Sequence, residues 1–99
     1  DFIFIDDVVS IINKFIIKNY SSGIYNVGTG QGTSIYTLLK IIDNAVNGND
    51  ILSKKYLNEV DLKKSNQNFF ACTKKLKKYL NNFSFTNIDS GIQKVIKYI

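Results

Sequence analysis

Three glycines within five residues, at positions 28, 30 and 32, constrain the fold of this chain more than any other feature of its sequence. A short apolar run at residues 24–27 precedes them, and an apolar stripe at helical spacing begins at Ile35. Glycine allows the backbone to turn sharply where a strand and a helix pack closely. The sequence therefore predicts a strand, a tight loop and a helix in that order, which is typical of an α/β fold.

The same reasoning predicts two further strands and three further helices. Residues 2–5 are an apolar run short enough to be a strand, and residues 51–56, which begin with Ile51 and Leu52, could be a third strand. Residues 57–68 are polar and irregular, which indicates a loop. The remaining apolar stripes have helical spacing, and each follows a residue able to cap a helix. We therefore expect one segment, residues 1–99, of α/β class, with four helices and two or three short strands. The expected cap residues are Asp6 or Asp7, Ser34, Thr73 and Asn87, and the expected helices cover residues 8–18, 35–46, 74–80 and 88–99.

Composition argues against several classes of site. The chain has no histidine and a single cysteine, Cys72, so it lacks an imidazole catalyst, an internal disulfide and the usual ligands of a zinc site. No apolar run approaches the roughly 20 residues that span a membrane, and no signal peptide is evident. We therefore expect a cytoplasmic protein with no metal and no membrane partner.

The basic charge is compatible with a second class of function. The net charge is +5, and all 13 basic residues are lysines. Lysine binds phosphate as a point charge, without the bidentate geometry of arginine. A lysine-rich, non-enzymatic binding module is therefore an alternative, although the lysines are scattered over several elements rather than clustered with aromatic residues. That scatter argues against a nucleic-acid partner.

The glycine loop is similar in outline to a dinucleotide-binding fingerprint, in which glycines let the backbone approach a pyrophosphate. Two details argue against that interpretation. The third fingerprint glycine falls at Thr33, and the expected acidic residue, Asp50, precedes the candidate strand instead of following it. We therefore expect no cofactor-binding residue in this chain, and we interpret the loop as a turn that packs a helix on a strand.

Other polar groups have simpler explanations than catalysis. Asp6 and Asp7 fit a helix cap better than a metal pair. Tyr36 and Lys40 share a helical face but have no other catalytic group around them. We therefore expect no catalytic residue in the chain. The lysines between residues 74 and 78 fit the solvent-exposed face of a helix, and Cys72 has no nearby base.

Three motifs together resemble a known family. They are the run from Asp1 to Val9, the run from Gly23 to Gly30 followed by Thr33-Ser34-Ile35, and the tail at residues 70–76 and 87–92. Their order and spacing are similar to the C-terminal third of extended short-chain dehydrogenases/reductases, the NAD-dependent epimerase/dehydratase proteins that act on nucleotide sugars. The resemblance covers nearly the whole chain.

The resemblance implies an enzyme whose chemistry lies upstream. Family members bind NAD or NADP in an N-terminal Rossmann domain and use a Tyr-x-x-x-Lys pair for proton transfer, and neither is in this chain. The resemblance also implies a nucleotide-sugar ligand and a homo-oligomeric parent. This chain would then be the C-terminal substrate-binding part of an extended Rossmann-type enzyme, inactive by itself. A degenerate remnant of such an enzyme is a further alternative.

The family motifs also indicate which residues would contact substrate. Phe2 matches an aromatic residue that lines the nucleotide pocket in some members. A phosphate-binding Arg often lies in the loop before the tail motif, where this chain has only Lys63 and Lys64. That loop is similar to the loop of ADP-glyceromanno-heptose 6-epimerases, in which a Tyr before Gln67 contacts the substrate; this chain has Asn66 there. Other nucleotide-sugar epimerases, dehydratases and reductases remain open.

Overall fold

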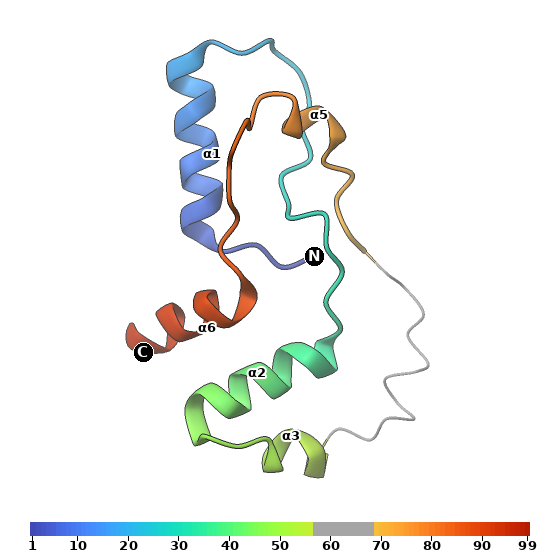
Figure 1. Cartoon of the computed structure of the whole chain (residues 1–99), viewed down its shortest axis with the longest axis vertical. Helices are drawn as coiled ribbons and strands as arrows, with labels where there is room; N and C mark the ends of the chain where they lie inside the picture. The colour runs from blue at the N-terminus through green and yellow to red at the C-terminus, as the bar shows by residue number, and fades with distance from the viewer. Residues whose placement is uncertain (57–68) are drawn as a thin grey trace. The chain divides into compact units, whose positions relative to one another are not determined.

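The computed structural model describes residues 1–56 and 69–99 (Figure 1). These residues form five helices and no strand. The chain divides into two compact units. Unit 1 comprises Asp1–Gly32 and Phe69–Thr86, and unit 2 comprises the described residues of Thr33–Asn68 together with Asn87–Ile99. The helices are α1 (Ile5–Lys18), α2 (Ile35–Asn47), α3 (Ile51–Tyr56), α5 (Lys74–Lys77) and α6 (Ile88–Lys97).

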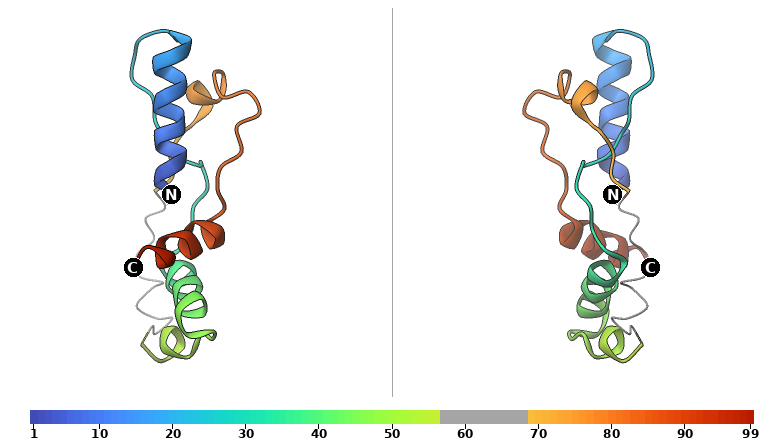
Figure 2. Two further views of the ribbon diagram at one scale, coloured as in Figure 1. Left: turned by 90° about the vertical axis from the view of Figure 1, so that its left-hand side faces the viewer. Right: turned by 90° about the vertical axis from the view of Figure 1, so that its right-hand side faces the viewer.

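Unit 1 is built on α1, with α5 beside it (Figure 2). Ile11 of α1 and Leu76 of α5 are almost fully buried, and Leu80 completes the core. Two acidic residues in the first turn and Lys18 in the last turn suit the helix dipole. The helix ends at Asn19, which adopts a left-handed conformation with φ 47°. Phe15, Tyr25, Phe83 and Phe85 pack against this core.

Unit 2 consists of α2, α3 and α6. The predicted caps are confirmed at two of these helices: Ser34 accepts a hydrogen bond from the Thr37 amide, and Asn87 accepts one from the Ser90 amide. Gly48 ends α2 in a left-handed conformation, with φ 71°. Both α3 and α6 pack against α2. The buried Gly91 lies in the first turns of α6, where its lack of a side chain permits close packing.

The predicted α/β class is wrong for the described residues, because none of the three expected strands forms. A strand requires a neighbouring backbone with which to exchange hydrogen bonds. At residues 24–27 side chains bond the backbone instead: Lys75 Nζ donates to the Ile24 carbonyl at 3.0 Å. At residues 2–5 the chain passes directly into α1, which begins at Ile5.

The third expected strand, residues 51–56, is the helix α3. Polar contacts at its start explain the difference. The Asn49 side chain accepts from the Ile51 amide at 3.1 Å, and the Lys54 amide donates to the Asp50 carbonyl at 3.1 Å. Lys54 Nζ also pairs with the Asp50 carboxylate at 3.0 Å, an i,i+4 contact that only a helix provides. The sequence-based prediction relied on the apolar pair Ile51 and Leu52 and did not take these local polar contacts into account.

Two predicted caps are also corrected. Phe4, not Asp6 or Asp7, is the N-cap residue of α1, and it has no side-chain cap bond. Asp7 instead accepts hydrogen bonds from the Thr86 amide at 2.8 Å and the Thr86 hydroxyl at 3.0 Å. Thr73 is the N-cap residue of α5 but its side chain makes no cap bond, and α5 ends at Lys77 rather than Leu80.

Candidate substrate-binding site

The carboxylate of Asp1 collects four hydrogen bonds from two other parts of the chain. Oδ1 accepts from the Thr29 amide at 3.0 Å and the Thr29 hydroxyl at 2.7 Å. Oδ2 accepts from the Gly30 amide at 2.9 Å and the Ala71 amide at 3.0 Å. Charged hydrogen bonds of this kind are stronger than neutral ones. We call Asp1, Thr29, Gly30 and Ala71 the Asp1 clamp; it joins three segments that are distant in sequence.

The glycine loop is shaped around this clamp. A Cβ added at Gly28 would lie 2.7 Å from both the Ala71 Cβ and the Asp1 Oδ2, so only glycine fits there. Gly30 has φ +77°, which favours glycine, and its amide faces the carboxylate. The amides of Thr29 and Gly30 therefore bind the Asp1 carboxylate. In a dinucleotide fingerprint, the corresponding loop amides would bind a pyrophosphate. The loop packs against Asp1 and Ala71, and the predicted packing of a helix on a strand is wrong, because residues 24–27 form no strand.

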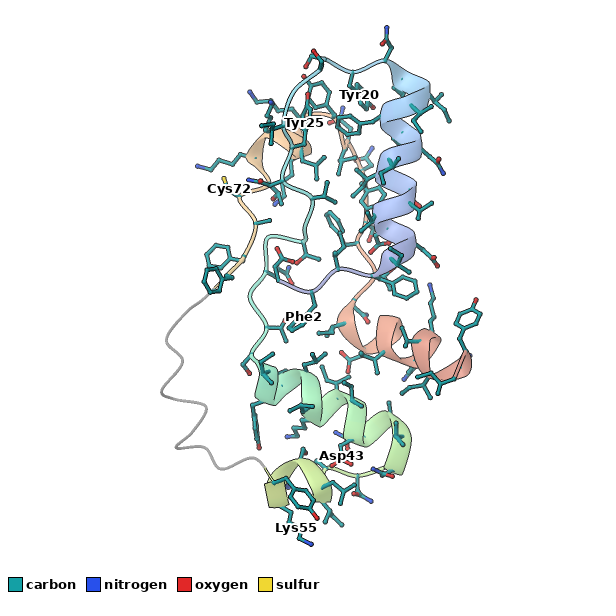
Figure 3. All side chains as sticks on the ribbon, turned by 180° about the vertical axis from the view of Figure 1, so that it is seen from behind. Phe2, Tyr20, Tyr25, Asp43, Lys55 and Cys72 are labelled. Atoms are coloured by element: carbon teal, nitrogen blue, oxygen red, sulfur yellow. The ribbon has the colours of Figure 1, made fainter. Side chains whose placement is uncertain are left out.

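Phe2, the predicted aromatic contact of the nucleotide, follows Asp1 directly (Figure 3). Its side chain is 39% exposed, so part of its ring is accessible to a ligand. The other predicted contacts lie outside the described residues. Those are Lys63, Lys64, Asn66 and Gln67.

Phe69 is the first described residue after residue 56. Its carbonyl accepts a hydrogen bond from the Asp1 nitrogen at 2.7 Å. Two residues later the Ala71 amide donates to the clamp. Phe70 lies against Gly32, at 3.8 Å from the position of an added Cβ. The structure therefore brings the segment that carries Phe2 together with the segment that follows the predicted substrate loop. The sequence motifs contain Phe2, Phe70 and Ala71 but do not reveal the hydrogen bonds that bring their segments together.

A second polar cluster in unit 1 was not predicted. The Ser21 hydroxyl lies 2.7 Å from the Tyr79 hydroxyl and 3.1 Å from the Tyr25 hydroxyl, which also donates to the Ser21 carbonyl at 2.6 Å. Hydrogen bonds from Ser21 and then Tyr25 lower the pKa of Tyr79. Phe15 makes edge-on ring contacts with both Tyr20 and Tyr25. These hydroxyls bond one another, so the cluster links the segment after α1 to the segment after α5 within unit 1.

The described lysines have varied surroundings. Lys75 donates to the Ile24 carbonyl and lies 4.4 Å from the centre of the Tyr25 ring. Lys40, which shares a helical face with Tyr36, lies 3.5 Å from the Asp50 carboxylate. Lys74 and Lys77 are exposed on α5, as expected of a solvent-facing surface. The paired lysines are thus engaged in intramolecular contacts.

Within residues 1–56 and 69–99, no group of three or more acidic or sulfur ligands could hold a metal ion. No described helix is long and apolar enough to cross a membrane. The Cys72 thiol is exposed (Figure 3). An open apolar groove of about 330 Å³ lies along α1, lined by residues that include Ile12, Phe15 and Val27.

Comparison with known proteins identifies two similar sequences, both named ADP-L-glycero-D-manno-heptose-6-epimerase. The protein from Brachyspira hyodysenteriae is 32% identical over 96 residues, which cover 95% of this chain and 29% of the relative. The protein from Fusobacterium nucleatum is 40% identical over 54 residues, which cover 54% of this chain and 16% of the relative. The resemblance to nucleotide-sugar epimerases is confirmed.

The similarity concerns the C-terminal part of these epimerases, as the motif order predicts. The chain spans less than a third of the length of either epimerase. No family model and no solved structure matches the chain. The epimerases therefore show what the C-terminal part of this sequence is similar to.

Proposed function

We propose that this chain contributes the substrate-binding side of an NAD(P)-dependent nucleotide-sugar epimerase or dehydratase. The observation that supports this most strongly is the 32% sequence identity to the Brachyspira epimerase over 96 residues. The name of that relative specifies an ADP-activated heptose, so a nucleotide sugar is the proposed ligand. A cytoplasmic location and a homo-oligomeric parent enzyme, both expected from the sequence, are part of the proposal.

The proposal assigns no cofactor contact to the glycine loop. The amides of Thr29 and Gly30, which would face a pyrophosphate in a fingerprint loop, bind the Asp1 carboxylate. NAD(P) would accept and return a hydride of the sugar, and the proposal assigns its binding to a Rossmann domain outside these 99 residues. The role left to this chain is to hold the nucleotide sugar.

Three kinds of side chain would make that contact. Phe2 offers a partly exposed ring to the nucleotide. Lys63 and Lys64 would each donate a charged hydrogen bond to the diphosphate, without the bidentate geometry of arginine. Asn66 and Gln67 would add neutral hydrogen bonds. The last four residues are assigned from the family motifs alone.

The alternative of a lysine-rich binding module has less support. A module of that kind needs lysines that are free to meet an anionic partner. Lys40 and Lys54 both contact the Asp50 carboxylate, and Lys75 is committed to the Ile24 carbonyl and the Tyr25 ring. These contacts reduce the charge available to such a partner.

A hybrid enzyme provides the direct test. Residues 1–99 would replace the matched segment of the Brachyspira epimerase, and turnover of ADP-L-glycero-D-manno-heptose would be measured. We expect the hybrid to be active and the isolated chain to be inactive. An inactive hybrid that is folded and binds NAD(P) but not the nucleotide sugar would show that this chain is not a working substrate-binding part, as expected of a degenerate remnant.

Paired lysine variants of the hybrid test the assigned contacts. Replacing Lys63 and Lys64 with Ala should weaken binding of the nucleotide sugar about tenfold or more, because charged hydrogen bonds contribute about 1.5–3 kcal/mol each. Cofactor affinity should not change. Replacing the exposed Lys74 and Lys77 is the matched control and should have little effect. Equal losses from the two double variants would indicate general electrostatic attraction and would contradict the assignment.

A further inference from the structure

The Asp1 clamp satisfies its carboxylate completely with donors from elsewhere in unit 1. Both oxygens accept two hydrogen bonds each, at 2.7–3.0 Å. The donors belong to Thr29, Gly30 and Ala71, which are separated from Asp1 by 28, 29 and 70 positions in the sequence. A carboxylate with four donors has little freedom to rotate, so the backbone of Asp1 is fixed relative to the glycine loop and to Ala71.

The direction of Phe2 depends on this arrangement. Phe2 is the next residue after Asp1, and its ring is only partly covered. Gly28 packs tightly against Asp1, since a Cβ added at Gly28 would lie 2.7 Å from the Asp1 Oδ2. A ring that must meet a ligand gains affinity when its direction is set in advance, because less conformational freedom is lost on binding.

We propose that Asp1 is a positioning residue, which acts on nucleotide-sugar binding through Phe2 by fixing the chain against the glycine loop and Ala71. The inference rests on the proposed function, since it requires Phe2 to contact the ligand. Asp1 itself has no free acceptor lone pair facing solvent to offer a ligand cation or hydroxyl, because its oxygens are occupied within the clamp. Its effect is therefore indirect.

Asp7 provides a matched control in the same unit. Its carboxylate also binds a distant amide and hydroxyl, both from Thr86, at 2.8 and 3.0 Å. Those bonds tie the first turn of α1 to the segment before α6, and they do not involve Phe2, the glycine loop or Ala71. A loss of general stability should therefore follow from Asp7→Asn as from Asp1→Asn, whereas a loss of ligand positioning should follow only from Asp1→Asn.

The test is a double-mutant cycle in the hybrid enzyme, with the dissociation constant for ADP-L-glycero-D-manno-heptose measured by calorimetry. The variants are Asp1→Asn, Phe2→Ala and the combination. We expect each single variant to weaken binding about tenfold. If Asp1 acts through Phe2, Asp1→Asn should weaken binding less than about twofold once Phe2 is already Ala. Asp7→Asn should weaken binding less than about twofold in either background.

The milder variant Thr29→Val keeps the inference testable if Asp1→Asn does not fold. It removes the hydroxyl bond to Oδ1 and the bond that this hydroxyl accepts from the Gln31 amide, and it leaves the three amide donors of the clamp in place. A smaller loss of affinity that again disappears in the Phe2→Ala background supports the inference. Additive effects of Asp1→Asn and Phe2→Ala, or equal effects of Asp1→Asn and Asp7→Asn, overturn it.

The proposed function fails in a different way. If Phe2→Ala leaves binding unchanged while the Lys63 and Lys64 double variant weakens it, the substrate-binding role stands and the role of Asp1 is overturned. If neither change affects binding, both are overturned. A coupled loss from Asp1→Asn and Phe2→Ala, with the lysine variant also weakened, supports both.

Discussion

The two compact units of this chain are stabilised by different kinds of polar contact. In unit 1, carboxylates reach across long stretches of sequence: Asp1 binds residues up to 70 positions away, and Asp7 binds a residue 79 positions away. In unit 2 the side-chain bonds of the described residues include local ones, such as the caps by Ser34 and Asn87 and the contact of Asp43 with Ser53, ten residues away. Long-range bonds close large loops of chain, so unit 1 depends more on its tertiary structure.

This difference predicts that a substitution in unit 1 will disturb more segments of the chain than a substitution in unit 2. A change in unit 1 should disturb many segments at once, because its contacts join them. A change in unit 2 should stay near its site, since helix caps and i,i+4 pairs are formed within one helix or between neighbouring ones. The following variants test this, beginning with the largest expected effect.

The largest effect should come from the core of unit 1. Leu76 is 1% exposed and packs with Ile11 and Leu80, so Leu76→Ala leaves a cavity and should cost about 2–5 kcal/mol. Nuclear magnetic resonance of the amide signals should show the loss across unit 1, from α1 to Thr86. Leu52→Ala, at an exposed position of α3, is the control and should cost much less. Equal costs would mean that Ile11 and Leu76 are not the principal core.

A somewhat smaller effect should come from Gly28→Ala. The new Cβ would meet Ala71 and the Asp1 carboxylate at 2.7 Å, so the clamp must open or shift. Overpacking of this kind costs about 1–3 kcal/mol. Amide hydrogen exchange should show lost protection at Thr29, Gly30 and Ala71 together. Gly32→Ala is the matched control, because its Cβ would meet only Phe70 at 3.8 Å, an ordinary contact.

Much of unit 2 was predictable because its signals are local. Ser34 and Asn87 precede apolar stripes and cap helices as expected, and Gly48 ends α2. The failure at Ile51 is also local: the pairing of Asp50 with Lys54 outweighs the appearance of a short apolar run. A six-residue segment is too short for periodicity to distinguish a strand from a helix.

Less of unit 1 was predictable, and the reason is the length of its contacts. The motif around Asp1 and the glycine loop indicated the family, but no local pattern indicates that Asp1 would bind residues 29, 30 and 71. Asp7 looked like a cap because acidic residues favour the start of a helix, yet its partner is Thr86. Phe2 was found only through the family motif, and the four predicted contacts in the loop stay predictions.

Acid should weaken unit 2 through Asp43. Its carboxylate lies between α2 and α3 and accepts from the Ser53 amide at 2.9 Å and the Asn47 side chain at 2.7 Å (Figure 3). The Ser53 bond, followed by the Asn47 bond, lowers the pKa of Asp43 below its value of 3.8 in an unfolded chain.

A lowered folded pKa means that the carboxylate stabilises the folded state above pH 3.8, and that this contribution is lost as the pH falls below 3.8 toward the folded pKa. Stability of unit 2 should therefore decline below that pH, measured by the α2 and α3 amide signals. In Asp43→Asn this part of the decline should be absent and the stability at neutral pH lower. An unchanged acid profile in the variant would exclude Asp43 as the cause.

The smallest effect should come from the cap of α2. Ser34 Oγ accepts from the Thr37 amide at 3.0 Å and lies 2.8 Å from the Thr37 hydroxyl. Ser34→Ala leaves that amide without its protein acceptor, although water can reach it because Ser34 is exposed. The expected cost is about 1 kcal/mol, and Ser34→Asp should restore it because Asp is an equally good cap. Signals from α2 should change, while those of the Asp1 clamp should not. If Ser34→Ala also reduced protection at Thr29, Gly30 and Ala71, the contrast between local and long-range stabilisation would fail.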